Sequence, residues 1–209
     1  MDDWITRQLL IKLTSNATCT WSELSIDGVA NNLQGYYMDK LKGRGLIAKT
    51  GNTWGLTDKG KIYADKLSLE TGRPTQQPKV CIDLLLRKDD RILLYKWTRA
   101  PLKGSYSLPF GRMHAEMSIK AALLHELADK CGMNYKDPSY RQLATIHAQT
   151  PYVSELHLVF EIDRPDLVRY SSNKGECIPV DTDKLNDIPM LDAHRTVLGS
   201  ALKAINNAN

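Results

Sequence analysis

Residues 111–133 read GRMHAEMSIKAALLHELADKCGM and carry the most informative pattern in this chain. Ser118 is a good helix N-cap, because its hydroxyl can accept a hydrogen bond from a backbone N–H in the first turn. Gly132 suits the left-handed position that follows the last turn of a helix. The pattern therefore predicts a helix from Ile119 to Cys131.

The spacing of this segment resembles the Nudix box, G-x5-E-x7-R-E-U-x-E-E-x-G-U. The opening glycine, the E-U pair and the closing G-U pair are present as Gly111, Glu126-Leu127 and Gly132-Met133. The preceding YSLPFG, residues 106–111, is similar to the W-x-L-P-G-G of that family. The resemblance implies a C-terminal Nudix domain over residues 79–209.

Strand and helix patterns flank the box on both sides. Apolar runs predict strands at residues 80–86, 91–97, 141–148 and 155–162, and a closing helix at 191–205. Strands that alternate with helices in this way are typical of a mixed sheet between helical layers. The expected class is α+β, with an α/β/α sandwich as the C-terminal domain.

The acidic positions of the box are only partly retained. Met117, His125 and Lys130 stand where the family pattern has Glu, Arg and Glu. The resemblance implies hydrolysis of nucleoside diphosphate derivatives, with Mg²⁺ held by box carboxylates. Mg²⁺ requires several oxygen ligands, and here Glu126 and Asp129 remain, three residues apart on one helical face. They predict a weak Mg²⁺ site, with Glu126 as the catalytic residue of a hydrolase.

Lys130 follows Glu126 by four residues, which is the favourable orientation for an ion pair on a helix. Three interpretations are open. The pair is an ordinary surface contact, or the lysine replaces the metal in an inherited phosphate site, or an altered metal site still works. For a phosphorylated ligand the expected contacts are Gly111, Arg112 and Lys130.

The N-terminal part of the chain reads as helices followed by a hairpin and a closing helix. Helices are expected at residues 5–13, 21–24, 30–42 and from 58 onward, and hairpin strands at 45–49 and 53–57. The runs LKGRGLI (41–47) and WGLTDKG (54–60) resemble the L-x-x-x-G-L-I and W-x-L-T-x-x-G pattern of prokaryotic winged-helix regulators. This resemblance implies a winged helix-turn-helix domain over residues 1–70.

Charge in this N-terminal part is unevenly distributed. Residues 39–66 contain seven basic and three acidic side chains, whereas the net charge of the whole chain is only +4. A basic face is needed to bind the phosphates of double-stranded DNA, and winged helices place their third helix in the major groove. The expected DNA-binding residues are Asn31, Gln34, Tyr36, Lys40, Arg44 and Lys49. The alternative is a winged helix used for protein contact or dimerisation.

Residues 71–78 read TGRPTQQP and are predicted to form the linker between the two domains. No apolar run reaches the length of a membrane helix, and the acidic N-terminus lacks the layout of a signal peptide. The four cysteines form no CxxC pair and are expected to be reduced thiols. The chain is therefore predicted to be a cytoplasmic protein without a membrane partner.

A Nudix domain with few box carboxylates, joined to a winged helix, resembles the Nudix-related transcriptional regulators. The leading hypothesis is a homodimeric DNA-binding regulator that responds to a phosphorylated nucleotide-type ligand. The alternative is a Nudix hydrolase with an altered box, and a third interpretation is a scaffold protein with neither activity.

Overall fold

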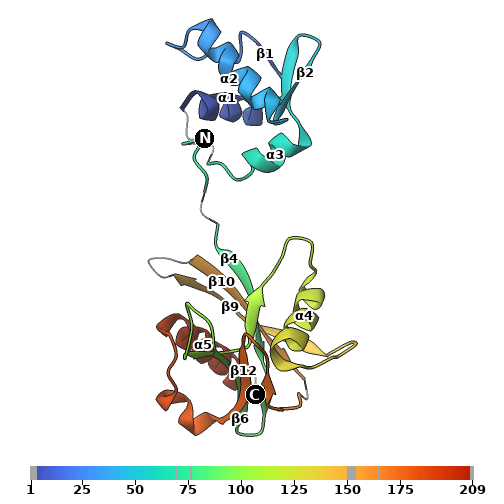
Figure 1. Ribbon diagram of the computed structural model, residues 1–209, viewed down its shortest axis with the longest axis vertical. Coiled ribbons are helices and arrows are strands. Elements are labelled where there is room, and N and C mark those ends of the chain that lie inside the picture. Colours follow the sequence, from blue (N-terminus) through green and yellow to red (C-terminus); the bar gives the residue numbers. More distant parts are fainter. Residues whose placement is uncertain (1–3, 69, 76, 150–153, 164, 208–209) are drawn as a thin grey trace. The chain divides into compact units, whose positions relative to one another are not determined.

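The computed structural model describes residues 4–68, 70–75, 77–149, 154–163 and 165–207. The chain forms two compact units, Met1–Gln76 and Gln77–Asn209. Figure 1 draws both units, and each has its own hydrophobic core. Within the described residues, no helix has the length and apolar character needed to cross a lipid bilayer.

The first unit combines helices with a small antiparallel sheet. Its helices are α1 (Trp4–Ser15), α2 (Asn31–Gly43) and α3 (Asp58–Ala64). Its strands are β1 (Cys19–Thr20), β2 (Ile47–Thr50) and β3 (Thr53–Leu56), in the order β1-β3-β2. The core takes Leu9 and Leu10 from α1, Met38 and Leu41 from α2, and Ile47 from β2.

The short motif L-T-x-x-G has a clear structural role at the start of α3. The Thr57 hydroxyl caps the helix by accepting a hydrogen bond from the Gly60 N–H at 3.0 Å, and it donates to the Gly45 carbonyl at 2.6 Å. Gly60 lies directly against the Leu46 carbonyl, which leaves no room for a Cβ atom. The motif thus fixes α3 to the chain that enters the hairpin.

The short helix predicted at residues 21–24 is wrong, because these residues form a single turn. Thr20 and Glu23 bracket this turn: the Thr20 N–H and hydroxyl both donate to a Glu23 carboxylate oxygen, at 2.6 and 2.8 Å. Leu24 and Ile26 are both buried. Residues two apart lie on different faces of a helix, so a continued helix could not bury both against the same core. The assignment of this unit to the winged-helix class stays a prediction.

Residues 71–75 of the predicted linker are hydrogen-bonded into the first unit. The Gly72 N–H donates to the Ser68 carbonyl at 2.7 Å, and the Thr75 N–H donates to the Lys66 carbonyl at 2.9 Å. Gly72 is buried against the Arg7 side chain at a positive φ of 61°, which favours glycine. The predicted linker therefore starts too early. Its first residues form a hydrogen-bonded turn around the buried Gly72, and their composition alone looks like that of a free loop.

The second unit contains most of the strands. Its strands are β4 (Lys79–Leu85), β5 (Arg87–Lys88), β6 (Arg91–Trp97), β7 (Tyr106–Ser107), β8 (Phe110–Arg112), β9 (Tyr140–Gln149), β10 (Ser154–Ile162), β11 (Tyr170–Ser171) and β12 (Gly175–Asp181). Its helices are α4 (Ile119–Cys131), the 3-10 helix η1 (Thr182–Asp187) and α5 (Asp192–Asn206). The strands predicted from apolar runs are confirmed, with ends shifted by a residue or so.

Two sheets form the centre of this unit. The first has the order β8-β4-β10-β9 and is mixed, because β4 and β10 run parallel while β8 and β9 are antiparallel to their neighbours. The second has the order β11-β12-β6-β5, with β7 also paired to β6. The structure is thus α+β with a mixed sheet, as expected.

Helices α4 and α5 cover opposite sides of these sheets (Figure 1). Ile82 and Leu84 of β4 pack with Leu123 of α4, whereas Leu85 packs with Val197 of α5. Strand β4 is therefore buried on both faces, which explains why it reads as a continuous apolar run rather than an alternating one.

Candidate functional site

Helix α4 begins and ends as the box sequence predicts. The Ser118 hydroxyl accepts a hydrogen bond from the Ala121 N–H at 3.2 Å. At the other end Gly132 has a φ of 68°, and its N–H and that of Met133 donate to the Ala128 and Leu127 carbonyls at 3.1 and 3.0 Å. Gly132 thus ends the helix in the left-handed conformation, so the G-U pair of the box closes α4.

The opening glycine of the box lies against the central carboxylate. Gly111 on β8 is in contact with the Glu126 carboxylate of α4, where an added Cβ would overlap the oxygens. Burial raises the pKa of Glu126, although the charges of Lys130 and His125 oppose this. Within the described part of the chain, Oε2 of Glu126 has no hydrogen-bond partner.

Lys130 is a buried cation rather than a surface residue, so the ordinary surface pair considered for Glu126 and Lys130 is wrong. Its side chain is only 8% exposed, and its Nζ lies 2.7 Å from Oδ2 of Asp129 and 4.0 Å from Oε2 of Glu126. The rings of Tyr95 and Trp97 lie beneath the same ammonium, each with its centroid 5.5 Å away. Carboxylates and aromatic faces therefore stabilise the charge in a largely buried position.

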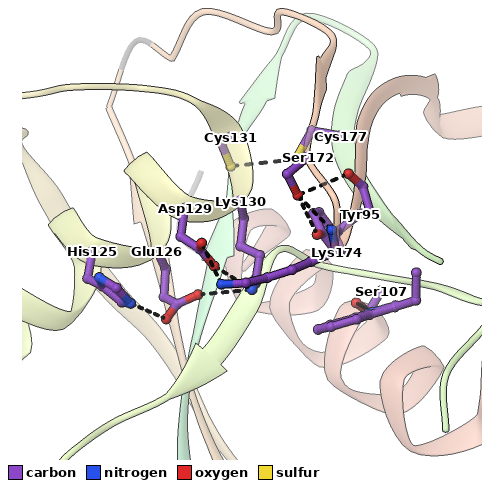
Figure 2. A network of polar contacts seen from close by, with 12 residues as sticks. Tyr95, Ser107, His125, Glu126, Asp129, Lys130, Cys131, Ser172, Lys174 and Cys177 are labelled. Atoms are coloured by element: carbon purple, nitrogen blue, oxygen red, sulfur yellow. Dashed lines mark hydrogen bonds and ion pairs between the residues drawn. The ribbon is translucent and has the colours of Figure 1, made fainter. Parts of the chain in front are cut away.

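A second lysine, Lys174, reaches the same carboxylate from the loop before β12. Its Nζ lies 2.7 Å from Oδ1 of Asp129, so each Asp129 oxygen binds one ammonium group (Figure 2). Burial acts to raise the pKa of Asp129, but the hydrogen bonds from Lys130 and Lys174 outweigh it and the pKa is lowered. Sequence reasoning did not find Lys174, which is far from the box in the chain.

Other expected contacts do not converge here. Arg112 pairs with Cys81 across β8 and β4, so strand alternation directs its side chain to the face opposite Gly111. Met117, at the first acidic position of the family pattern, packs against the core under α4. His125 is about half exposed, with its Nε2 3.9 Å from Oε1 of Glu126.

The acidic residues of this site do not form a metal cluster. In the ranges that the structure describes, no three His, Cys, Asp or Glu side chains are placed to hold a metal ion. Glu126 and Asp129 remain as a pair, but both oxygens of Asp129 already accept hydrogen bonds from lysines. These residues do not fit the Mg²⁺ expected from the family resemblance, because Mg²⁺ needs near-octahedral oxygen ligands at short distance.

A second polar network lies on the α5 side of the sheet. His157 Nδ1 donates to Oδ2 of Asp83 at 2.8 Å, and its Nε2 lies 3.6 Å from Oε2 of Glu155. The His194 ring of α5 packs against the rings of His157 and Phe110, with centroids 5.9 and 5.0 Å away. The charged residue within the apolar run of β4 is the sequence signal that could have revealed this network.

The two histidines of the network carry opposite pKa shifts. Burial alone would lower the pKa of His157, but hydrogen bonding and charge interactions with Asp83 and Glu155 raise it to about 9. Burial, together with the charge of His157, lowers the pKa of His194 to about 4. At neutral pH the first ring is therefore charged and the second is neutral.

The predicted DNA-binding residues are only partly on the surface. Asn31, Lys40 and Lys49 are exposed, Tyr36 is 59% exposed, and Arg44 is half-buried with its guanidinium 5.2 Å from the Tyr63 ring. Lys40 lies over the Tyr36 ring at 5.8 Å from its centroid. A surface depression of about 650 Å³ beside the hairpin is lined by Thr20, Trp21, Ser22, Lys49, Asn52 and Trp54.

Gln34 is a correction to the predicted DNA-binding set. Its side chain is fully buried, and its amide oxygen accepts a hydrogen bond from the Ile26 N–H at 3.3 Å. Gln34, Met38 and Leu41 follow the spacing of one helical face, which is the face that packs inward. A buried side chain that fixes the chain before α2 is not available to contact a base.

No family model matches this chain. The ADP-ribose pyrophosphatase of Methanocaldococcus jannaschii is 27% identical over 118 residues, which cover 54% of this chain and 70% of that protein. The Nudix domain of Shewanella oneidensis NrtR, solved in complex with ADP ribose, aligns at a TM-score of 0.51 with 15% identity, covering 72% of this chain and 99% of that one. A MutT protein from Methanosarcina mazei aligns at a TM-score of 0.54 with 16% identity, covering 65% and 99%. This chain therefore contains a Nudix fold.

Proposed function

We propose that this chain is a ligand-responsive, DNA-binding transcriptional regulator. Its Nudix-fold unit binds a phosphorylated nucleotide-type ligand, and its first unit acts as a winged helix on double-stranded DNA. A regulator that reads a palindromic site matches it with its own twofold symmetry, so the proposal includes a homodimer.

The observation that carries this proposal is the pair of lysines on Asp129. A Nudix hydrolase needs a cluster of carboxylates to hold Mg²⁺ against its substrate, because the metal bridges phosphate oxygens. Here Lys130 and Lys174 each bind one oxygen of Asp129, and the Met117 side chain supplies no carboxylate. Such a site favours binding over hydrolysis.

The comparisons support a ligand of the ADP-ribose type. The protein from Methanocaldococcus jannaschii is named for ADP-ribose, and the NrtR domain was solved with ADP ribose bound. ADP-ribose is therefore the first compound to test. A rise in the melting temperature that does not depend on Mg²⁺ supports a binding role, since a ligand stabilises the state that binds it.

Two exposed lysines of the first unit, one on α2 and one on β2, support the DNA-binding part of the proposal. Lys40 and Lys49 are exposed and lie over aromatic rings, at 5.8 Å from the Tyr36 centroid and 5.7 Å from the Trp54 centroid. Cationic and polar side chains of this kind contact phosphates, and they make binding depend steeply on salt.

The test is a selection of duplex DNA from a random pool, followed by binding measurements at several salt concentrations. The double variant Lys40→Ala/Lys49→Ala should flatten the dependence of affinity on salt by a slope of about 2, because two phosphate contacts are lost. As a matched control, Lys120→Ala/Lys184→Ala removes the same charge from the second unit and should leave the slope unchanged. No binding at low salt, or equal slopes in both double variants, contradicts the DNA-binding role.

Hydrolysis is the second candidate function, favoured by the 27% identity to a pyrophosphatase and by the retained Glu126. It predicts release of AMP from ADP-ribose in the presence of Mg²⁺, abolished by Glu126→Gln. A wild-type protein that binds ADP-ribose without consuming it supports the regulator instead.

A further inference from the structure

Two ammonium groups converge on Asp129 (Figure 2), and the two lysine side chains differ in exposure. The Lys130 side chain is 8% exposed and is held between Asp129 and the rings of Tyr95 and Trp97. The Lys174 side chain is 43% exposed, and its Nζ makes an ion pair with Oδ1 of Asp129. One lysine is therefore buried among its partners, and the other is partly open to solvent.

The charges of this site balance without a metal ion. Glu126 and Asp129 supply two carboxylates, and Lys130 and Lys174 supply two ammonium groups within 4.0 Å of them. A divalent cation would have to displace at least one lysine from Asp129 and would meet the second as a repelling charge. At about 4 Å such repulsion is substantial even at a protein surface.

We infer that Lys130 and Lys174 together replace the divalent cation of the Nudix box, Lys130 as a fixed counter-charge and Lys174 as the arm that binds a ligand phosphate. The ligand class is an anionic phosphate ester or diphosphate, bound without a metal. This rests on the proposed function only in that the ligand is phosphorylated.

The geometry explains why Lys130 can remain with Asp129 while Lys174 binds a phosphate. When a phosphate recruits Lys174, Asp129 keeps its hydrogen bond to Lys130 at 2.7 Å and is not left unpaired. Lysine suits this role because its ammonium is a point charge on a flexible stem, with hydrogen-bond donors that need no fixed plane. In this proposal Lys130 stays buried and paired with Asp129, and Lys174 makes the direct ligand contact that was expected of Lys130.

The first experiment measures Mn²⁺ binding, as a probe for divalent cations, by electron paramagnetic resonance of the free ion. Wild-type protein should leave Mn²⁺ free, whereas Lys130→Glu should bind it and should gain melting temperature when Mn²⁺ is added. If Lys130→Glu does not fold, Lys174→Glu places a carboxylate beside Asp129 at an exposed position and should also bind. Mn²⁺ binding by wild-type protein that Glu126→Gln removes would overturn the inference.

The second experiment measures inorganic pyrophosphate and ADP-ribose binding by calorimetry, in the presence of a chelator and again with Mg²⁺. Lys174→Ala should weaken binding of both compounds by about tenfold in the chelator, the loss expected for one charge-assisted contact. Lys184→Ala is the matched control, because Lys184 makes a similar 2.6 Å ion pair with Asp181. Binding that requires Mg²⁺, or equal affinities of Lys174→Ala and wild type, would overturn the inference.

Neither experiment contains DNA, so its outcome is separate from that of the regulator proposal. A protein that binds DNA but also binds Mn²⁺ through Glu126 refutes the lysine replacement alone. A protein that binds pyrophosphate through Lys174 but never binds DNA refutes the regulator alone.

Discussion

Gly111 shows how one residue sets the geometry of the site. Its contact with the Glu126 carboxylate brings β8 against α4, and no larger residue fits between them. The same contact keeps Glu126 beneath the strand, where burial raises the pKa of the carboxyl group. The glycine of the box is thus required for close approach and not for a special backbone angle.

We predict that Gly111→Ala destabilises the protein by about 1–3 kcal/mol, because the added methyl group overlaps the Glu126 carboxylate and forces strand and helix apart. The measurement is the free energy of unfolding in urea. Gly199→Ala is the control, since its position in α5 has open space around the Cβ and should be neutral or slightly stabilised. If both variants have the same free energy of unfolding, strand and helix accommodate the methyl group beside Glu126 without loss of stability.

The residues of the box could be predicted from sequence, and their partners could not. Spacing alone located Glu126, Asp129 and Lys130 on one helix, because helix geometry is local. Lys174 lies 45 positions beyond Asp129, and only the folded chain brings them together. The burial of Gln34 could have been predicted from its helical spacing with Met38, but its amide suggested the surface.

At the scale of elements, β12 is the longest strand that the sequence did not predict. This strand contains Pro179, which has no N–H to donate and usually argues against a strand position. It nevertheless pairs with β6 along its whole length, with Pro179 opposite Leu93. Because β12 was not expected, the lysine that immediately precedes it was not expected in the site either.

Strands β4 and β10 and helix α5 are joined by the network of Asp83, Glu155, His157 and His194. The pKa of His194 in the folded protein is about 4, below its value of about 6.5 in an unfolded chain. Between these values the unfolded state binds more protons, so stability is present above pH 6.5 and is lost as the pH falls towards 4. The full loss is about 3 kcal/mol.

We therefore predict that His194→Phe reduces this acid destabilisation by about 3 kcal/mol, because a phenyl ring keeps the packing and cannot be protonated. The measurement is the free energy of unfolding in urea from about pH 4 to about pH 10, which spans both histidine pKa values. The alkaline side serves as a control. The pKa of His157 is raised to about 9, so its contribution is present below pH 6.5 and is lost as the pH rises through 9. The loss of stability at alkaline pH should persist in His194→Phe. If the variant still loses the same stability between pH 6.5 and 4, His194 is not the cause of the acid destabilisation.

At the scale of the whole molecule, the two units are joined by a shorter segment than the sequence suggests. Residues 70–75 are tied to the first unit by backbone hydrogen bonds, and β4 of the second unit begins at Lys79. Gln77 and Pro78 between them are exposed. The polar composition of residues 71–78 could locate the junction between the units. It could not reveal the turn at its start, because that turn is held by backbone hydrogen bonds and not by apolar side chains.

We predict that a protease of broad specificity cuts first between Thr75 and Lys79, since hydrogen-bonded backbone resists the extended conformation that cleavage requires. The measurement is mass spectrometry of the products of limited digestion. A fragment that starts near residue 77 and keeps its melting transition is the expected product. First cleavage within residues 70–75 would mean that this turn opens readily.

The burial of Lys130 makes its positive charge costly to exchange for a negative one. A Lys130→Glu substitution would place a third carboxylate beside Glu126 and Asp129, against the rings of Tyr95 and Trp97. Without a bound cation those negative charges repel each other in a poorly solvated position, so the variant should be markedly more stable where divalent cations are present. One residue would thus make the folding of the whole unit depend on the metal content of the medium.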